Sequence, residues 1–508
     1  MSRTGKSTVN SLVGLICSIL SSILSFLLRG AFIRLLGLEY AGINSLFTDI
    51  LKLLNLVDLG VSNAILVRLY RSCAHNDEEE TELFLSTYRK ICYFLATVIT
   101  IGGLACTPFL KYLVKSQPTF PEPLWALFII VLGNSFVAHA WCYTPALFTA
   151  KQERFIATLI QYLCLFLRHG LQLLLLFLYK NIYLYLLVPI FTTALRFGIS
   201  ALVSKRRYHI RYSSPKRLPP EKRKELVKDV GSLSVYKLCR TLDATVDTML
   251  ISRFVSVAVT GIYGSIAMIF NALDELLGVF NDGMIASIGD LHALGKSESL
   301  KRVFYQSFHL NYLLFGISAV TLVPFVSDFV KLWIGHTLSD TCIYVIIVNF
   351  VIYGFGMNVA TFRNAIGIFQ KGWLRPAFTA GFNLLFSITL VIKIGLLGTL
   401  LGTTIARCLT LVWYDPYLVC RHGFGAKPYQ YYLRYIVYFV FLAITSSLLL
   451  LLRRTLPPMN TILAAISHGL LYLGCGSSLL LFLGMCFSEQ KEIFFRFKGM
   501  LNRRRRSL

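Results

Sequence analysis

The chain has 508 residues, of which 56% are hydrophobic and 15% are charged. This balance excludes an ordinary soluble protein of this size. The formal net charge is +25. The basic residues lie in short loops between apolar stretches and not in a basic folded domain, so the charge argues against a nucleic-acid partner.

Apolar stretches follow one another along the whole chain, and each is long enough to cross about 30 Å of hydrocarbon. We therefore predict an all-α integral membrane protein with about fourteen transmembrane helices. The expected spans are 9–36, 41–67, 88–113, 124–148, 155–179, 182–203, 230–252, 256–281, 304–330, 342–369, 376–393, 396–419, 435–452 and 461–487. Lys and Arg are most numerous in alternate loops, which places both termini in the cytoplasm. The first stretch is long and leads into another span, so it does not read as a cleavable signal peptide.

The strongly basic, proline-broken segment 204–229 is predicted to be a solvated cytoplasmic linker. It separates residues 1–203, an N-terminal bundle of six spans, from residues 230–419, a C-terminal bundle of six spans. Residues 420–508 add two further spans and a basic cytoplasmic tail.

A weak internal repeat supports the division into two bundles. A shift of 219 residues places Arg34 on Arg253, Gly42 on Gly261 and Ile43 on Ile262. Each trio marks the turn from one predicted helix to the next, which is typical of a duplicated helical bundle.

Each of the first two spans carries one polar stripe at helical spacing. The stripes consist of Ser11, Gly14, Ser18, Ser21, Ser22, Ser25 and Arg29 in the first span, and of Asn44, Thr48, Lys52, Asn55, Asp58 and Ser62 in the second. Because unpaired polar groups are costly in hydrocarbon, two such stripes indicate a wet, charge-bearing interior, which is typical of a transporter.

Cationic residues recur within the spans of both halves, and we predict that they bind an anionic cargo. The candidate substrate-binding residues are Arg29, Lys52, Arg168, Arg240, Arg363 and Arg407. The guanidinium fork suits phosphate oxygens, and a desolvated site strengthens that attraction. Asn, Gln, Ser and Tyr side chains around the arginines suit a hydroxyl-rich headgroup. Together these features indicate a lipid that carries a diphosphate and a sugar.

Three aspartates, Asp58, Asp243 and Asp247, are candidates for coupling to protons or sodium. Burial raises the pKa of a carboxylate and neighbouring arginines lower it, so such a group can bind and release a cation. A purely structural role remains the alternative for several of these charged and polar residues. Arg240 and Asp243 would neutralise each other as a pair. Arg29, Arg168, Arg196 and Arg363 would snorkel to an interface. The serine face of the first span would be a close-packing helix surface.

The stretch 29–71, RGAFIRLLGLEYAGINSLFTDILKLLNLVDLGVSNAILVRLYR, is followed by the acidic HNDEEETE. Its RLLGLEYAGINSLF and VDLGVSNAI segments resemble the opening of the polysaccharide repeat-unit flippases. These are the Wzx-like O-antigen and capsule transporters of the multidrug/oligosaccharidyl-lipid/polysaccharide exporter superfamily. The resemblance in sequence covers about the first ninety residues, whereas the topology agrees over the whole chain.

This resemblance implies a V-shaped pair of bundles that alternates between inward-open and outward-open forms. It implies an undecaprenyl-diphosphate-linked oligosaccharide as cargo, moved across the bacterial cytoplasmic membrane. Arg29 matches the span-1 arginine that engages the diphosphate in the related lipid II flippases.

Two other functions remain open from the sequence. A multidrug exporter of the same fold would carry mostly cationic drugs, and the excess of arginine counts against it. A membrane polysaccharide polymerase or ligase would tend to carry a large external loop, whereas every predicted outer loop is short. The sequence contains no CxxC pair, Walker motif or Gly-rich phosphate loop. We therefore expect a monomeric transporter in contact with membrane lipids, not an enzyme, without metal or cofactor.

Overall fold

A computed structural model describes residues 3–58, 61–210, 212, 219, 241–243, 245–368, 372 and 374–492. Near the N-terminus it describes side chains at 14, 16–56 and 62, and then from 64 onward. The described residues form helices and connecting turns, with no β-strand among them. The chain divides into two compact units, Met1–Gly264 and Ser265–Leu508.

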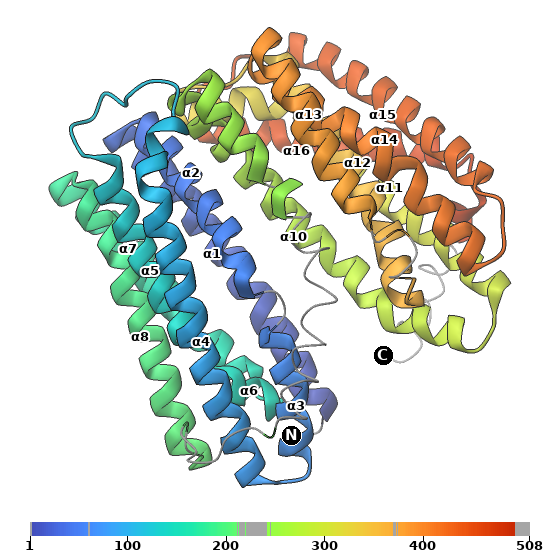
Figure 1. The fold of residues 1–508 in the computed structure, drawn as a ribbon. Coiled ribbons are helices and arrows are strands. Elements are labelled where there is room, and N and C mark those ends of the chain that lie inside the picture. The colour runs from blue at the N-terminus through green and yellow to red at the C-terminus, as the bar shows by residue number, and fades with distance from the viewer. Residues whose placement is uncertain are drawn as a thin grey trace. The chain divides into compact units, whose positions relative to one another are not determined.

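The first unit is a helical bundle in which α7 packs against α1 and α8, and α5 packs against α4 and α8 (Figure 1). Its elements are α1 (Arg3–Leu36), α2 (Leu38–Leu54), the 3-10 helix η1 (Asn55–Asp58), α3 (Val61–Ala74), α4 (Glu78–Cys106), the 3-10 helix η2 (Thr107–Tyr112), α5 (Leu124–Ala140), α6 (Ala146–Ala150), α7 (Arg154–Tyr179), α8 (Ile182–Tyr208) and the π-helix η3 (Ile251–Val255).

The boundary between the units falls inside α10 (Val257–Ala293), whose first turns belong to the first unit. The second unit continues with α11 (Ser297–Ile334), α12 (Asp340–Ile366), α13 (Arg375–Ile394), α14 (Leu396–Gly423), α15 (Tyr429–Thr455) and α16 (Ile462–Gly484). In it α11 packs against α12, α15 and α16, and α13 runs along α14. The stacked rings of Tyr312 and Tyr438, with centroids 4.1 Å apart, lie at the centre of the α11–α15 contact.

Eleven helices of the described chain are long and apolar enough to cross a membrane. They correspond to eleven of the fourteen spans expected from the sequence. The other three expected spans are the broken pair α2–α3, the 17-residue α5, and 230–252, most of which lies outside the described residues.

Local sequence explains where several helices begin and end. Asp77 caps α4 by accepting a hydrogen bond from the backbone N–H of Glu80, and Asn181 caps α8 in the same way. The helix α5 ends at Ala140, five residues before Pro145, where the N–H of Cys142 bonds the carbonyl of His139 three residues back instead of continuing the α-helical ladder. Gly37, with φ 107°, makes the turn between α1 and α2 in a backbone conformation that side chains disfavour.

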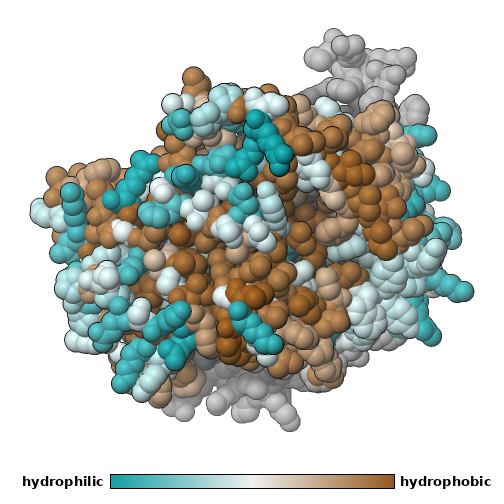
Figure 2. Space-filling model, turned by 90° about the horizontal axis from the view of Figure 1, so that it is seen from above, coloured by the Kyte–Doolittle hydropathy of each residue, from teal (hydrophilic) through white to brown (hydrophobic). Residues whose placement is uncertain are grey.

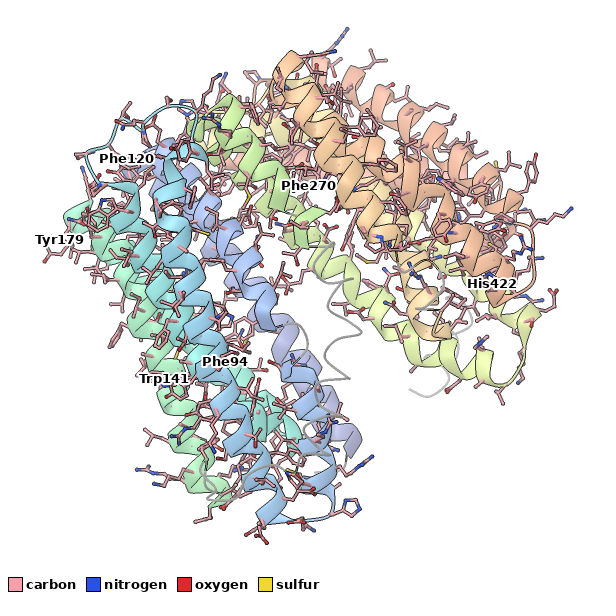
Figure 3. All side chains as sticks on the ribbon, in the orientation of Figure 1. Phe94, Phe120, Trp141, Tyr179, Phe270 and His422 are labelled. Carbon is pink, nitrogen blue, oxygen red and sulfur yellow. The ribbon has the colours of Figure 1, made fainter. Side chains whose placement is uncertain are left out.

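The surface is rich in exposed apolar side chains. Figure 2 shows brown, hydrophobic atoms over much of the face in view, with hydrophilic residues in separate patches. Leu178 and Tyr179 on α7 and Phe94 on α4 are each more than 60% exposed, and Phe94 and Tyr179 are labelled in Figure 3. Soluble proteins rarely expose so much apolar surface, whereas helices that face lipid do so along their length.

The segment between η2 and α5 is tied to the start of α2. Glu39 accepts hydrogen bonds from the backbone N–H and the hydroxyl of Thr119, both at 2.7 Å. The next residue, Tyr40, donates to Glu122 and stacks its ring on Phe120 at 4.2 Å (Phe120 is labelled in Figure 3). Two adjacent residues of α2 therefore hold this segment in place.

The π-helix η3 holds the same segment from a second direction. The backbone N–H of Lys115 donates to Ser252 O at 3.1 Å, and Arg253 Nη1 donates to Val114 O at 3.4 Å. The segment thus links two parts of the first unit that are far apart in sequence.

Candidate functional site

Arg29 lies near the C-terminal end of α1, where α1 meets the starts of α2 and α10. Its Nη2 atom donates to Gly261 O at 3.0 Å, to Ser45 Oγ at 3.3 Å and to Ala41 O at 3.4 Å. Carbonyl and hydroxyl oxygens are neutral acceptors, so the described hydrogen bonds orient the guanidinium without cancelling its charge.

A cavity of about 320 Å³ lies within the first unit, between α2, α5, α7 and α8. Polar side chains from all four helices line it. They are Asn44, Thr48, Lys52, Asn55, Asn134, Ser135, His139, Arg168, Gln172 and Tyr185. Four residues of the polar stripe expected in the second span are among them, so the predicted shared face exists and borders this cavity.

Two of the predicted cationic residues, Lys52 and Arg168, line this cavity from α2 and α7. Lys52 Nζ is 2.7 Å from the carboxylate of Asp49, one turn earlier on α2. Arg168 differs: its Nε atom is buried, and no residue in the described part of the chain accepts a hydrogen bond from it. The lining contains no carboxylate among its described residues. The cavity therefore has a net positive charge.

Arg29 and Arg168 are connected through one aromatic side chain. Tyr185 lies near both guanidinium groups, and its ring packs against Phe32 at 4.5 Å between centroids. Three of the six predicted cationic residues, from α1, α2 and α7, thus lie in one region of the first unit. The prediction that they contact cargo stays a prediction.

Arg363 and Arg407 lie in the second unit on α12 and α14. Arg363 is buried, donates to Asp415 Oδ1 at 3.1 Å and also binds two backbone carbonyls. Arg375 approaches the other oxygen of Asp415 at 2.8 Å. Arg407 Nη1 donates to Asn349 O at 3.3 Å, and its charge interacts with Asp274. Arg363 therefore does not snorkel to an interface, because it lies inside an ion cluster.

The remaining predicted residues are Arg240 and the three aspartates. Arg240 and the side chain of Asp58 lie outside the described residues. Asp247 is buried and accepts a hydrogen bond from the Tyr263 hydroxyl at 3.4 Å. Asp243 is half-buried in the short helical segment before η3. Their coupling to protons or sodium stays a prediction.

Arg168 lines a cavity instead of reaching an interface, and the serine face of α1 has a packing role as well. Ser25 Oγ lies 3.4 Å from His169 Nε2, which joins α1 to α7. Asn134, Ser135 and His139 also line the cavity, and they are not among the residues predicted from the sequence. In the sequence, Ser135 follows Asn134 directly and His139 comes four residues after Ser135, whereas the rest of α5 is apolar. This pattern was the signal that marks the three residues as one face.

The comparisons with known proteins agree with this architecture. A family described as "Polysaccharide biosynthesis protein" matches residues 7–283. The solved structure of the lipid II flippase MurJ in an inward closed conformation has a TM-score of 0.68 at 15% identity, over 92% of this chain and 98% of that chain. No curated protein matches the sequence.

Two other solved structures have the same fold. An inward-facing multidrug resistance MATE family transporter of the MOP superfamily has a TM-score of 0.60 at 15% identity, over 79% of this chain and 96% of that one. A MOP superfamily transporter from Pyrococcus furiosus has a TM-score of 0.52 at 13% identity, over 81% and 94%. At these identities the likeness concerns the fold, which is that of a multi-pass membrane transporter.

Proposed function

Because the chain belongs to the polysaccharide biosynthesis protein family, we propose that it is a flippase for undecaprenyl-diphosphate-linked oligosaccharide repeat units. It would act in the bacterial cytoplasmic membrane with both termini in the cytoplasm, as a monomer and without covalent chemistry. The observation that carries this proposal is the gathering of Arg29, Lys52 and Arg168 in one region of the first unit, beside a lining rich in amides.

The chemistry of these groups fits a diphosphate with an attached sugar. Guanidinium groups bind phosphate oxygens through charge-assisted hydrogen bonds, which are about twice as strong as neutral ones. The acceptors that Arg29 has on Ala41 and Gly261 are neutral carbonyls. An anionic phosphate oxygen would outcompete them, so Arg29 would exchange these partners for cargo when a headgroup arrives. Amide side chains such as Asn44 and Asn134 would bind sugar hydroxyls.

Directional transport by alternating access needs an energy source, and we propose that Asp58, Asp243 and Asp247 supply the coupling site for protons or sodium. Asp247 supports this role because it is buried and carries a Tyr263 hydroxyl as hydrogen-bond donor. A carboxylate in such a place changes its charge when it binds a proton or a cation, which alters its interactions with neighbouring groups.

A multidrug exporter of the same fold is the second candidate, since a MATE transporter structure matches with a TM-score of 0.60. The charge of the cavity lining disfavours cationic drugs, because Lys52 and Arg168 border it and the described lining has no carboxylate. We therefore rank an anionic lipid-linked cargo above a cationic drug.

The test is a deletion strain of the source bacterium that is complemented with single variants. Deletion should stop surface polysaccharide and make finished lipid-linked repeat units accumulate on the cytoplasmic side, whereas loss of a polymerase would leave flipped single units. Arg29→Ala and Arg168→Ala should fail to complement. Arg196→Ala is the matched control, because Arg196 on α8 donates to Gln161 and does not line the cavity.

If the two arginine variants reach the membrane at normal levels and still sustain surface polysaccharide, the cationic site is wrong. If the wild-type chain instead rescues dye efflux in a pump-deficient strain, and its deletion leaves polysaccharide intact, the multidrug function replaces the proposed one.

A further inference from the structure

We infer that the cavity between α2, α5, α7 and α8 is a binding site for one small anion, with Arg168 as its principal ligand. The ligand class is a halide or a single phosphate-like group, supplied either from solution or by a phosphorylated lipid headgroup. This inference does not depend on the proposed cargo, because it follows from the cavity's own chemistry.

The first argument is the state of Arg168. Its guanidinium is charged under all physiological conditions and carries five donors. Its Nε is buried, yet none of the described residues accepts a hydrogen bond from this atom. Buried charges in proteins are otherwise paired or hydrogen-bonded. Arg168 borders the cavity with a donor that has no acceptor within the described chain, so an anion bound in the cavity would stabilise it.

The second argument is the direction of the neighbouring hydrogen bonds. The Thr193 hydroxyl donates to Asn134 Oδ1 at 2.9 Å, and the Ser135 hydroxyl donates to Asn55 Oδ1 at 3.3 Å. Each amide has its acceptor oxygen engaged by the protein and keeps its NH₂ donors. Two amides of the lining therefore offer N–H groups, which is the arrangement that binds anions.

The third argument is that nearby charges do not satisfy Arg168. The carboxylate of Asp49 lies against Lys52 at 2.7 Å, and Asp49 is not part of the cavity lining. Gln172 donates its Nε2 to Tyr185 O, so the amide acceptors left to the described lining include Gln172 Oε1 and Asn44 Oδ1, both neutral oxygens. A neutral oxygen does not balance a full positive charge.

The size of the cavity fits a small ligand. Its volume of about 320 Å³ is the space of about ten liquid water molecules. That space holds chloride or phosphate together with several waters.

The experiment measures anion binding to the purified full chain in nanodiscs. The probes are chloride, inorganic phosphate and geranyl diphosphate, each titrated at constant ionic strength. Binding is read by equilibrium dialysis of radiolabelled probe and by the rise of the thermal midpoint, because a ligand that binds the folded state raises it. We expect one site per chain.

Arg168→Gln should lower the affinity at least about tenfold, which is the usual size of a lost charge-assisted hydrogen bond. Ala138→Leu, which fills the cavity without changing its charge, should weaken binding as well and serves if Arg168→Gln does not fold. Arg196→Gln should leave the affinity unchanged, because Arg196 has Gln161 as its partner at 2.8 Å, outside the cavity.

Binding of inorganic anions that depends on Arg168 identifies a site for ions from solution. Binding of geranyl diphosphate alone, again dependent on Arg168, identifies a site for a lipid phosphate. Absence of binding by all three probes, or binding that neither Arg168→Gln nor Ala138→Leu weakens, overturns the inference. A chain that binds chloride in this way but does not sustain surface polysaccharide contradicts the proposed cargo and leaves the anion site standing.

Discussion

Gly42 and Gly261 lie against each other's helices in a reciprocal way. A Cβ on Gly42 would collide with the carbonyl oxygen of Val257, and a Cβ on Gly261 would collide with the carbonyl oxygen of Leu38. The 219-residue shift exchanges the two contacts, because it places Gly42 on Gly261 and Leu38 on Val257. The weak sequence repeat therefore has a structural counterpart, a close crossing of α2 and the first turns of α10 that only glycine allows.

Substitution at this crossing should be costly. Gly42→Val and Gly261→Val should each destabilise the chain by at least about 1–3 kcal/mol, because the new side chain meets backbone and the helices must separate. The measurement is the thermal midpoint in detergent and the yield of monodisperse protein. Gly198→Ala on α8 is the control, since a Cβ there meets nothing within 4 Å. Equal midpoints for the Gly42 variant and this control would contradict the crossing.

The ion cluster in the second unit gives a second prediction. Asp415 is 1% exposed and pairs with Arg363 and Arg375. Asp415→Asn leaves two cations without their carboxylate, so we expect a loss of about 3–5 kcal/mol in the free energy of unfolding. Asp328→Asn breaks the more exposed pair with Arg453 and should cost only about 0–1 kcal/mol. Unfolding in mixed micelles compares the two; similar losses would show that burial does not set the cost.

A third prediction concerns pH. Burial raises the pKa of Glu489, but the hydrogen bond and charge of Arg434 outweigh it and hold the pKa below its ordinary value of 4.5. A carboxylate whose pKa is lowered on folding stabilises the fold above its unfolded pKa, and this contribution disappears as the pH falls through the folded pKa. The wild-type thermal midpoint should therefore decline below about pH 4.5. Glu489→Gln and Arg434→Gln should have lower midpoints at pH 7 and flatter acid profiles; profiles parallel to wild type would rule the pair out as a cause.

The reciprocal amide pair of Asn281 and Asn311 gives a fourth prediction. Each side chain donates to the other, at 3.0 and 2.8 Å, and both are buried between α10 and α11. Asn281→Leu alone leaves the Asn311 amide without this partner, so we expect a loss of about 1–2 kcal/mol. The double variant should cost less than the sum of the single variants. Additive losses in a double-mutant cycle would mean that the two amides act independently.

Helix positions were largely predictable because a membrane-spanning helix needs a long apolar run, and α7, α8 and α12 lie within a few residues of their expected bounds. Two expected spans were too long. The second continues only to Leu54 as an α-helix before η1, and the fourth ends at Ala140. Hydropathy averages over a window, so it does not register a local break.

The candidate site was predictable only where one helix supplies the pattern. Arg168 and Gln172, four residues apart on α7, do share the face that borders the cavity. Gln161, seven residues before Arg168 on the same helix, instead accepts a hydrogen bond from Arg196 and does not line the cavity. The pairing of Arg363 with Asp415 joins residues 52 apart in sequence. Such a contact depends on how α12 packs against α14, which helical periodicity does not encode.

The doubly anchored segment between η2 and α5 has a practical consequence for spectroscopy. Lys115 and Thr119 are fixed to η3 and α2 on either side of Gln117. A spin label or fluorophore on Gln117 would therefore share the slow tumbling of the helices and not the fast local motion of an ordinary linker. Distances measured from that label would report displacements of α2 itself.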